Sequence, residues 1–365
     1  MLYSELRMQK RINLVENVPL PSPLTLYIDP CNKCNYRCSY CFHSAENYSS
    51  LCGGYYTLSV SDAEKIATQL KEIGSVKTIN FHATGEPLLN QNLPEIIKIF
   101  HQNRLAERIQ LTTNGSLLTP DKALKLLQSG VDFFRISLYG GTTTLHQKRS
   151  HSRVTLDNIR DNISQLISLR NARQFSASIA VKMLETGDKK EEKEFLDFFN
   201  GVADECFIEK VHNFSSSEYF DIESSIHIKP EKGGCPICPL PFYRLVIHSN
   251  LDVSPCDADS FHEVILGNLR ETSLKDIWNG ENLHKLQLAH LSKNFPEGHH
   301  CSSCEFYTTQ VDDLSALSAE EYKNVFTNSY SKKSENNSKL PFRLLCPQGR
   351  VAGFSLHGRH GHASQ

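Results

Sequence analysis

Between residues 24 and 212, short apolar runs alternate with segments whose apolar residues recur every three or four positions. The short runs predict buried strands, and the 3.6-residue period predicts amphipathic helices. The expected strands are 24–28, 76–81, 108–112, 131–137, 176–182 and 205–211. The expected helices are 60–73, 93–102, 120–128, 155–169 and 189–199. This alternation predicts an α/β fold with a parallel sheet and right-handed crossovers.

Local signals support two of these helices. Ser61 or Asp62 can cap the helix at 60–73, while Thr119 can cap the helix at 120–128, which Gly130 ends. Six strands of this kind form either an open doubly wound sheet or an incomplete barrel. In both architectures, ligands bind at the carboxyl ends of the strands.

The pattern changes after residue 212. A polar, Ser-rich stretch at 214–231 predicts a linker, and residues 245–247, a turn at 249–252 and the run from 253 predict a hairpin. A helix is expected over 273–290. The segment 322–340 is polar, which predicts disorder. We assign no structure to the last 24 residues.

Composition narrows the class of protein. The 365 residues suggest about two domains. With 39 Lys and Arg against 41 Asp and Glu, the net charge of −2 gives no electrostatic reason to expect nucleic acid or an anionic membrane as partner. We expect a cytoplasmic protein, since no run is long and apolar enough to span a bilayer and the start lacks a signal-peptide pattern.

The 12 cysteines are therefore candidate metal ligands or catalytic thiols, because thiols in a reducing compartment serve in these roles more often than as disulfides. Cys34, Cys38 and Cys41 follow the first strand within eight residues. Structural zinc usually takes four protein ligands, whereas three thiolates leave one iron of a four-iron cluster open. The spacing favours iron–sulfur. A zinc loop that includes Cys31 or a distant fourth ligand stays an alternative.

The run Cys34-Asn-Tyr-Arg-Cys38-Ser-Tyr-Cys41, after a strand of the form LxLxI, resembles the signature of the radical S-adenosylmethionine (radical SAM) superfamily. The resemblance implies that the three cysteines bind a 4Fe–4S cluster whose open iron chelates S-adenosylmethionine. An electron from the cluster then cleaves the sulfonium, and the 5′-deoxyadenosyl radical takes a hydrogen atom from a substrate. It also places Tyr40 near the adenine. Cys31 lies outside the match and is interpreted as a bystander.

Three further turns agree with this family. Gly85-Glu86-Pro87 after the second strand resembles the GGEP motif that contacts the amino group of S-adenosylmethionine, although Thr84 stands where a glycine is usual. Asn114 belongs to a TNG turn after the third strand. Ser137, in the SLYG element that ends the fourth strand, is a candidate for the ribose or carboxylate. His146 also fits the family pattern, but a core or solvated histidine explains it equally well. The resemblance covers roughly 24–212 and implies a partial (β/α)6 barrel.

A second cysteine set consists of Cys238, Cys256, Cys301 and Cys304. Four thiolates suit zinc or a closed cubane equally. The segments CPLPF, LDVSPC, GNLRETSLKDIWN and CSSCE, however, resemble the SPASM/Twitch extension of radical SAM enzymes. The shortened set implies one auxiliary 4Fe–4S cluster, as in 2-deoxy-scyllo-inosamine dehydrogenase-like enzymes. Cys235 is an alternative to Cys238. His299 and His300 are weaker ligand candidates, because adjacent side chains seldom face one metal.

These assignments give a domain layout. It consists of an N-terminal extension at 1–23, a radical SAM core at 24–212, a linker at 213–234, a SPASM/Twitch-like domain at 235–310 and a partly disordered extension at 311–365.

Several reactions fit this layout. A dehydrogenase of a sugar or aminocyclitol alcohol would pass an electron to the auxiliary cluster. An epimerase would need a thiol hydrogen donor, for which Cys235, then Cys206, then Cys52 are candidates, each also explained by a structural role. A ribosomal-peptide maturase and a non-enzymatic zinc or iron–sulfur protein are further alternatives.

The resemblance implies a flavodoxin- or ferredoxin-type electron donor and a small-molecule or peptide substrate. The pocket candidates at the strand ends, Lys182, Glu185, His212 and Asn213, do not select one molecule.

Overall fold

A computed structural model describes residues 12–209 and 235–330. His212, Asn213, the predicted linker at 213–234 and the tail from 331 lie outside the described residues.

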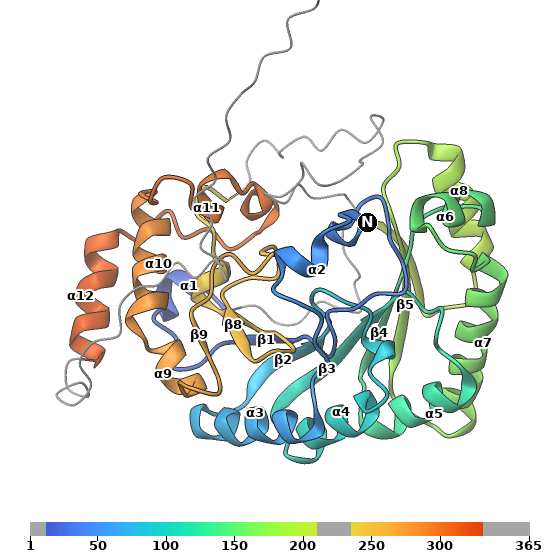
Figure 1. Cartoon of the computed structure of the whole chain (residues 1–365), viewed down its shortest axis with the longest axis horizontal. Coiled ribbons are helices and arrows are strands. Elements are labelled where there is room, and N and C mark those ends of the chain that lie inside the picture. The colour runs from blue at the N-terminus through green and yellow to red at the C-terminus, as the bar shows by residue number, and fades with distance from the viewer. Residues whose placement is uncertain (1–11, 210–234, 331–365) are drawn as a thin grey trace, which may run out of the picture.

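The described chain builds one nine-stranded sheet in the order β6-β5-β4-β3-β2-β1-β7-β8-β9. The first six strands run parallel, as predicted, and wind into the open barrel of Figure 1. They are β1 Thr25–Ile28, β2 Val76–Phe81, β3 Ala106–Thr113, β4 Phe133–Leu138, β5 Ser178–Leu184 and β6 Glu205–Glu209.

Amphipathic helices cover the outer face of this barrel (Figure 1). They are α3 Val60–Ile73, α4 Leu93–Gln102, α5 Pro120–Ser129, α7 Leu156–Ala172 and α8 Lys189–Phe199, each close to its predicted range. Thr119 caps α5 and Gly130 ends it in a left-handed conformation, as expected. The predicted cap of α3 was wrong, because Ser59 rather than Ser61 or Asp62 accepts the hydrogen bond from the Asp62 backbone.

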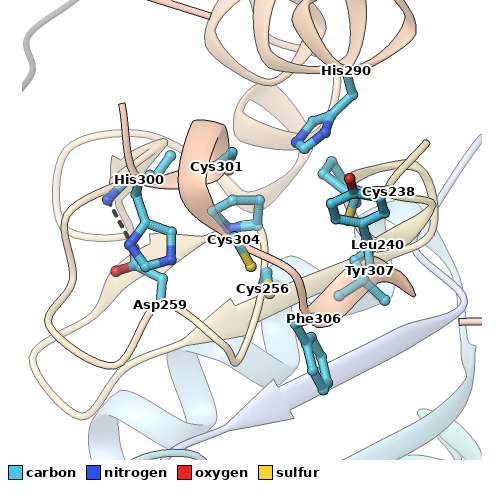
Figure 2. A pocket seen from close by; sticks show the side chains of 13 residues that line it. Cys238, Leu240, Cys256, Asp259, His290, His300, Cys301, Cys304, Phe306 and Tyr307 are labelled. Carbon is cyan, nitrogen blue, oxygen red and sulfur yellow. Dashed lines mark hydrogen bonds between the residues drawn. The ribbon is translucent and has the colours of Figure 1, made fainter. Parts of the chain in front are cut away.

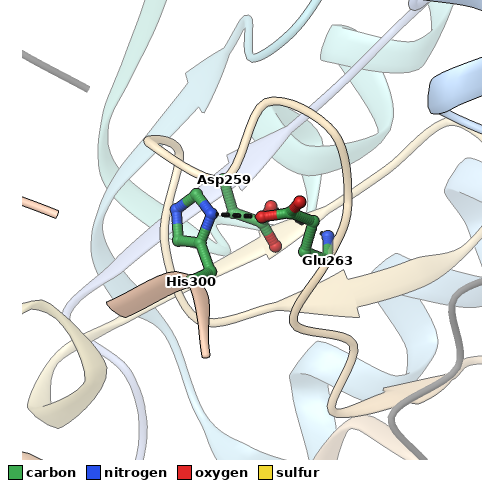
Figure 3. A group of neighbouring side chains, drawn as sticks. All are labelled: Asp259, Glu263 and His300. Atoms are coloured by element: carbon green, nitrogen blue, oxygen red, sulfur yellow. Dashed lines mark hydrogen bonds and ion pairs between the residues drawn. The ribbon is translucent and has the colours of Figure 1, made fainter. Parts of the chain in front are cut away.

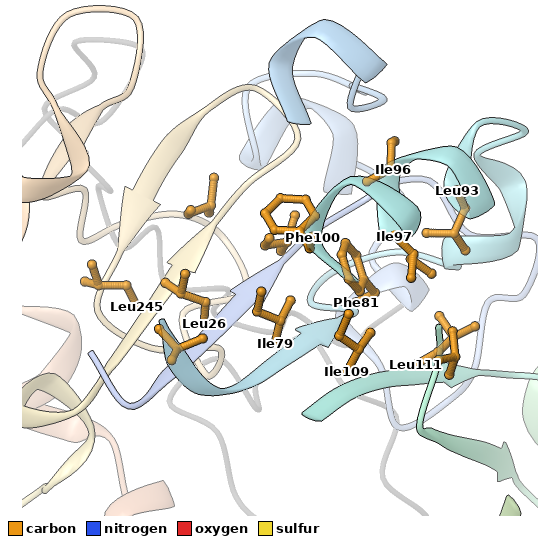
Figure 4. Close-up of a cluster of buried hydrophobic side chains, with 14 of the residues drawn as sticks. Leu26, Ile79, Phe81, Leu93, Ile96, Ile97, Phe100, Ile109, Leu111 and Leu245 are labelled. Atoms are coloured by element: carbon orange, nitrogen blue, oxygen red, sulfur yellow. The ribbon is translucent and has the colours of Figure 1, made fainter. Parts of the chain in front are cut away.

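The apolar core lies between the sheet and these helices. Alternate residues of β1, β2, β3 and β7 point outward and belong to the same apolar cluster as the buried face of α4 (Figure 4). Labelled members are Leu26, Ile79, Phe81, Leu93, Ile96, Ile97, Phe100, Ile109, Leu111 and Leu245. Since strand side chains alternate between faces, the intervening residues face the barrel interior.

The barrel interior is polar. Buried side chains that alternate with the outward core residues include Asn80, Gln110, Lys182, Glu209 and Arg244. A small apolar group of Phe133, Ala180 and Phe207 is separate from the main core. An interior of this kind suits a polar ligand better than a packed apolar filling would.

The predicted hairpin is present, but it belongs to the same sheet as the barrel. β7 Arg244–Ile247 pairs in parallel with β1, while β8 Asp252–Ser254 and β9 Gly267–Asn268 follow in antiparallel order. The second cysteine set is therefore attached to the edge of the barrel by continuous backbone hydrogen bonds.

Two expectations for the C-terminal part were wrong. The single helix expected at 273–290 is two helices, α9 Leu274–Trp278 and α10 Glu281–Ser292, because Gly280 interrupts it and caps the second. Residues 322–330, expected to be disordered, belong to α12 Ala319–Tyr330. Tyr322 is buried there and donates a hydrogen bond to Gln287 of α10 (2.7 Å). None of the helices in the described ranges combines the length and apolarity needed to cross a bilayer.

Candidate functional site

The loop after β1 brings Cys34, Cys38 and Cys41 together. Burial, together with the nearby Glu86 and Cys41, raises the pKa of the Cys34 thiol to about 12. Burial also raises the pKa of Cys38, with added contributions from Cys41 and Cys34. These mutual effects on the thiol pKa values mean that the three sulfur atoms lie close together. They could therefore bind one positively charged metal centre. Cys31 is buried beside them but contributes to neither shift.

Gly85 fixes the position of this loop. A Cβ atom at Gly85 would lie 1.9 Å from the carbonyl oxygen of Cys31 and 2.5 Å from that of Lys33. The next backbone N–H, that of Glu86, donates to the Lys33 carbonyl (2.7 Å). Only glycine allows the turn after β2 to approach the cysteine loop this closely.

The Glu86 carboxylate joins the turn after β2 to the turn after β3. One oxygen accepts hydrogen bonds from Thr113 Oγ1 (2.6 Å) and the Leu88 N–H (3.0 Å), and the other from the Asn114 N–H (2.9 Å). The Asn114 side chain then donates to Asn35 in the cysteine loop (2.9 Å). Glu86 and Asn114 therefore hold three loops in register around the thiols, whatever their contacts to a bound cofactor.

The other side of the cysteine loop rests on α6 Thr143–Ser150, which the sequence did not reveal. The N–H groups of Ser39 and Arg37 donate to the carbonyls of Arg149 and Ser150 (2.8 and 3.1 Å). Arg149 is itself buried and ion-paired with Glu191 of α8. The mixed polar sequence of α6 shows no amphipathic period, so no pattern signalled it.

Two further predicted residues lie near this loop. Ser137 is buried at the end of β4, and Tyr40 is half-buried within the loop. His146 lies in the interior of α6, where burial lowers its pKa to about 4, so it is neutral at pH 7.

A group of buried polar side chains lies where β1, β7 and β8 end. Asp29 and His248 follow the paired residues Ile28 and Ile247. The ring of His262 lies against that of His248, tilted by 33°, with 3.7 Å between ring centroids. One oxygen of Asp29 accepts a hydrogen bond from Thr84 (2.5 Å), and His248 bonds to Ser254 (2.8 Å). In the described part of the chain, Oδ1 of Asp29, Nδ1 of His248 and both ring nitrogens of His262 are buried without a partner.

This Asp–His group connects the two cysteine sites. Thr84 precedes Gly85 in the turn that holds the first cysteine loop, and Ser254 donates to the carbonyl of Cys256 (3.3 Å). An unpaired buried polar atom costs about 1–3 kcal/mol, so four of them are expected to receive partners from a ligand or water.

A second polar network joins β4, β5 and β6. Glu209 accepts from Lys182 (2.8 Å) and pairs with Arg135. Burial lowers the pKa of Lys182, and Glu209 opposes that shift. Glu185, the other predicted pocket residue in the described range, is partly exposed and lies 3.7 Å from Lys189.

The four cysteines of the second set line one pocket, together with mainly apolar side chains (Figure 2). Cys238 precedes η5 Leu240–Phe242, and Cys256 follows β8. Cys301 lies within α11 His300–Ser303, and Cys304 directly follows that helix. Burial, together with the nearby Cys304, raises the pKa of Cys238 to about 12. Burial likewise raises the pKa of Cys256 and of Cys301, and Cys238 adds to both shifts. The four thiols therefore converge.

The remaining cysteines lie elsewhere. Cys235 donates to the carbonyls of Gln310 and Asp312 (both 3.1 Å) and does not line the pocket. Cys206 packs against the main apolar core, on the face of β6 opposite the interior residue Phe207. Cys52 is buried with Tyr48 and Phe261.

Asp259, Glu263 and His300 form a polar group at the second pocket, which Asp259 and His300 also line (Figures 2 and 3). His300 contacts Glu263 at 2.6 Å. Asp259 accepts the backbone N–H groups of Glu263 and Val264 (2.9 and 2.8 Å). Burial opposes protonation of His300, but Glu263 raises its pKa overall. These contacts satisfy the group without an ion, and they occupy His300, one of the weaker ligand candidates.

Both cysteine sets suit iron–sulfur clusters. Several thiols crowded in a mainly apolar space repel one another when ionised, and only a multiply charged centre compensates that repulsion. The first set offers three sulfur ligands and the second four, which matches one cluster with an open iron and one fully ligated cluster.

The parallel partial barrel with a three-cysteine loop after β1 defines a radical SAM fold. Residues 28–198 match the family model of the Radical SAM superfamily, and residues 238–305 match that of the SPASM iron–sulfur cluster-binding domain. The chain belongs to the radical SAM superfamily and carries a SPASM domain, so its cofactors are 4Fe–4S clusters and S-adenosylmethionine.

Curated relatives carry out different reactions. The chain is 24% identical over 338 residues to a tungsten-containing aldehyde ferredoxin oxidoreductase cofactor-modifying protein of Pyrococcus furiosus, covering 79% of this chain and 90% of that protein. It is 30% identical over 133 residues to a PqqA peptide cyclase of Streptomyces rochei, covering 36% and 34%. It is also 30% identical over 147 residues to a GTP 3′,8-cyclase of Staphylococcus carnosus, covering 40% and 42%. The chain therefore spans well under half of these two cyclases.

Solved structures share the fold. BtrN in complex with AdoMet and 2-DOIA is similar with a TM-score of 0.50 and 17% identity, covering 80% of this chain and 95% of that one. Streptococcus suis SuiB bound to its precursor peptide SuiA is similar with a TM-score of 0.55 and 18% identity, covering 84% and 78%. At these identities the likeness shows the fold alone.

We predict that Gly85→Ala prevents assembly of the first cluster, because the added Cβ meets backbone atoms that cannot move away. Iron content after anaerobic reconstitution should fall from about eight to about four per chain. Gly267→Ala is the matched control, since its Cβ would meet the flexible end of Ile277. Full iron content in Gly85→Ala would contradict the packing argument.

We predict that Cys238→Ala, but not Cys235→Ala, removes the auxiliary cluster. Only Cys238 lines the pocket with Cys256, Cys301 and Cys304. The measurement is iron content together with the electron paramagnetic resonance (EPR) spectrum of the reduced protein. Retention of two cluster signals in Cys238→Ala, with loss of one in Cys235→Ala, would reverse this assignment.

Proposed function

We propose that this radical SAM enzyme dehydrogenates an alcohol of a sugar- or aminocyclitol-type small molecule. The observation that carries the proposal is the convergence of four thiols in a pocket joined to the barrel by the β1–β7 pairing. An enzyme that only transfers a hydrogen atom does not need a second redox centre close to its barrel, whereas a dehydrogenase does.

The electron balance explains that need. When bound, the first cluster and S-adenosylmethionine supply a 5′-deoxyadenosyl radical, which takes a hydrogen atom from the substrate. The alcohol radical must still lose one proton and one electron to become a ketone. The auxiliary cluster is the electron acceptor for which this chain offers ligands.

The chain's own residues serve this reaction in separate ways. Cys34, Cys38 and Cys41 hold one centre, and Gly85 and Glu86 keep the surrounding turns in place. Tyr40, Pro87, Asn114 and Ser137 are the remaining candidates to contact S-adenosylmethionine. Asp29, His248 and His262 offer unpaired hydrogen-bonding atoms between the two cysteine sites. A polyhydroxylated or amino-substituted substrate would satisfy them, and an imidazole nitrogen can accept the proton.

The alternatives have weaker support. An epimerase needs a thiol facing the substrate, yet Cys206 packs in the outer core and Cys235 is engaged with two carbonyls. The support for a peptide substrate is the similarity of the chain to a peptide cyclase and to peptide-bound SuiB. We further propose a flavodoxin- or ferredoxin-type electron donor and a cytoplasmic location.

Cleavage of S-adenosylmethionine is the first test. We expect Cys34→Ala, Cys38→Ala or Cys41→Ala to abolish 5′-deoxyadenosine formation under dithionite, measured by liquid chromatography. Cys31→Ala is the matched control in the same loop and should retain formation. If Cys31→Ala also abolished it, the assignment of the three ligands would be wrong.

The reaction type is tested by turnover in deuterated water, with 2-deoxy-scyllo-inosamine, inositols, hexoses and a peptide library as probes. A dehydrogenase should release one ketone, two hydrogens lighter, per 5′-deoxyadenosine. The ketone should carry no deuterium at the reacting carbon. An epimer with solvent deuterium would show an epimerase instead, and a modified peptide would show a maturase.

A further inference from the structure

Arg244 is a buried cation to which the proposed reaction assigns no role. It opens β7, pairs in register with Thr25 of β1, and is only 9% exposed. In chain order it lies six residues after Cys238, and its Nη1 forms an ion pair with Asp257, the neighbour of Cys256. The guanidinium thus lies between the barrel and the auxiliary pocket.

Aromatic rings hold the guanidinium in place. Its central carbon lies 4.7 Å from the ring centroid of Tyr27 and 5.6 Å from that of Tyr243. Tyr27 is an interior residue of β1, in register with Asn80 of β2, and its ring contacts His82 at 5.1 Å. Arg244 therefore contacts the barrel interior through Tyr27 and the segment that carries Cys256 through Asp257.

The charge of Arg244 reaches the auxiliary ligands. Arg244 favours a lower pKa for the thiols of Cys238 and Cys256, whereas Asp257, its ion-pair partner, favours a higher pKa for Cys256. Its Nε is buried and has no hydrogen-bond partner among the described residues. Burial of a guanidinium with one carboxylate is seldom favourable by itself. A cluster held by four thiolates supplies further negative charge that would compensate it.

We propose that Arg244 sets the reduction potential of the auxiliary cluster, raising it so that the cluster can accept an electron from the substrate side of the barrel. Reduction adds one negative charge to the cluster, and a fixed buried cation stabilises the reduced form more than the oxidised form. No bond to Arg244 forms or breaks. The electron moves from the alcohol radical to the oxidised cluster, and the guanidinium stays protonated throughout. This inference rests on the proposed dehydrogenation for its purpose, but not for its measurement.

The test measures the midpoint potential of the auxiliary cluster without substrate. In the full chain carrying Cys34→Ala, Cys38→Ala and Cys41→Ala, only the auxiliary cluster can assemble, so an EPR-monitored redox titration reports on it alone. Arg244→Gln in this background should disfavour reduction at least tenfold, a negative shift of about 59 mV for a one-electron couple. Arg244→Lys should retain most of the potential because the charge stays.

Two further variants make the result decisive. Asp257→Asn removes the opposing charge and should shift the potential upward. Arg270→Gln removes an exposed arginine of the same domain and should leave the potential unchanged. Equal potentials in Arg244→Gln and Arg270→Gln would overturn the proposal. If Arg244→Gln loses iron, an unshifted potential in Asp257→Asn would overturn it.

The two proposals can fail separately. A shifted potential together with no ketone from any probe would support the role of Arg244 and refute the dehydrogenation. A ketone product together with unshifted potentials would support the dehydrogenation and refute the role of Arg244.

Discussion

Strand β1 pairs in parallel on both of its edges, with β2 on one side and β7 on the other, and the functional site depends on this pairing. Its last residue leads into the loop that carries the first three cysteines. Its neighbour β7 begins six residues after Cys238 and ends at Ile247, directly before His248, so both cysteine sites are placed relative to one rigid element. Hydrogen bonds in the interior of a sheet resist displacement more than a flexible linker would, which fixes the separation between the two centres.

The barrel interior shows what this arrangement requires. Lys182, Glu209, Arg135 and Arg244 are buried charges, and each would be costly without its partner. Glu209 pairs with Lys182 and Arg135, and Arg244 pairs with Asp257. Unpaired buried atoms nevertheless occur at Asp29, His248 and His262, between the two cysteine loops. Buried polar atoms without hydrogen-bond partners destabilise the ligand-free protein. A bound hydroxylated or amino-substituted ligand would supply the missing hydrogen bonds and recover this free energy.

Much of the fold could be predicted because local patterns determine it. The ranges of α3, α4 and α8, and the cap of α5 by Thr119, follow from side-chain periodicity and capping chemistry alone. The β1–β7 pairing joins residues more than two hundred positions apart, and nothing in either strand specifies its partner. Likewise α6 and the Arg149–Glu191 pair are set by tertiary contacts. The first cysteine set was predictable from its spacing, and the second from the resemblance of the segments around it to a SPASM/Twitch extension. The role of Glu86 as a link between loops depends on geometry.

The raised pKa values of the cysteines connect folding to cluster assembly. Burial and neighbouring thiols keep Cys34 and Cys238 protonated at pH 7, so loading iron must release protons from groups that hold them tightly. Binding of the cluster therefore supplies the free energy that ionises the thiols. Cations placed nearby reduce the free energy that this ionisation needs. Arg244 lies next to the second set, and Arg37, whose Nη1 donates to the carbonyl of Cys34 (2.9 Å), lies next to the first.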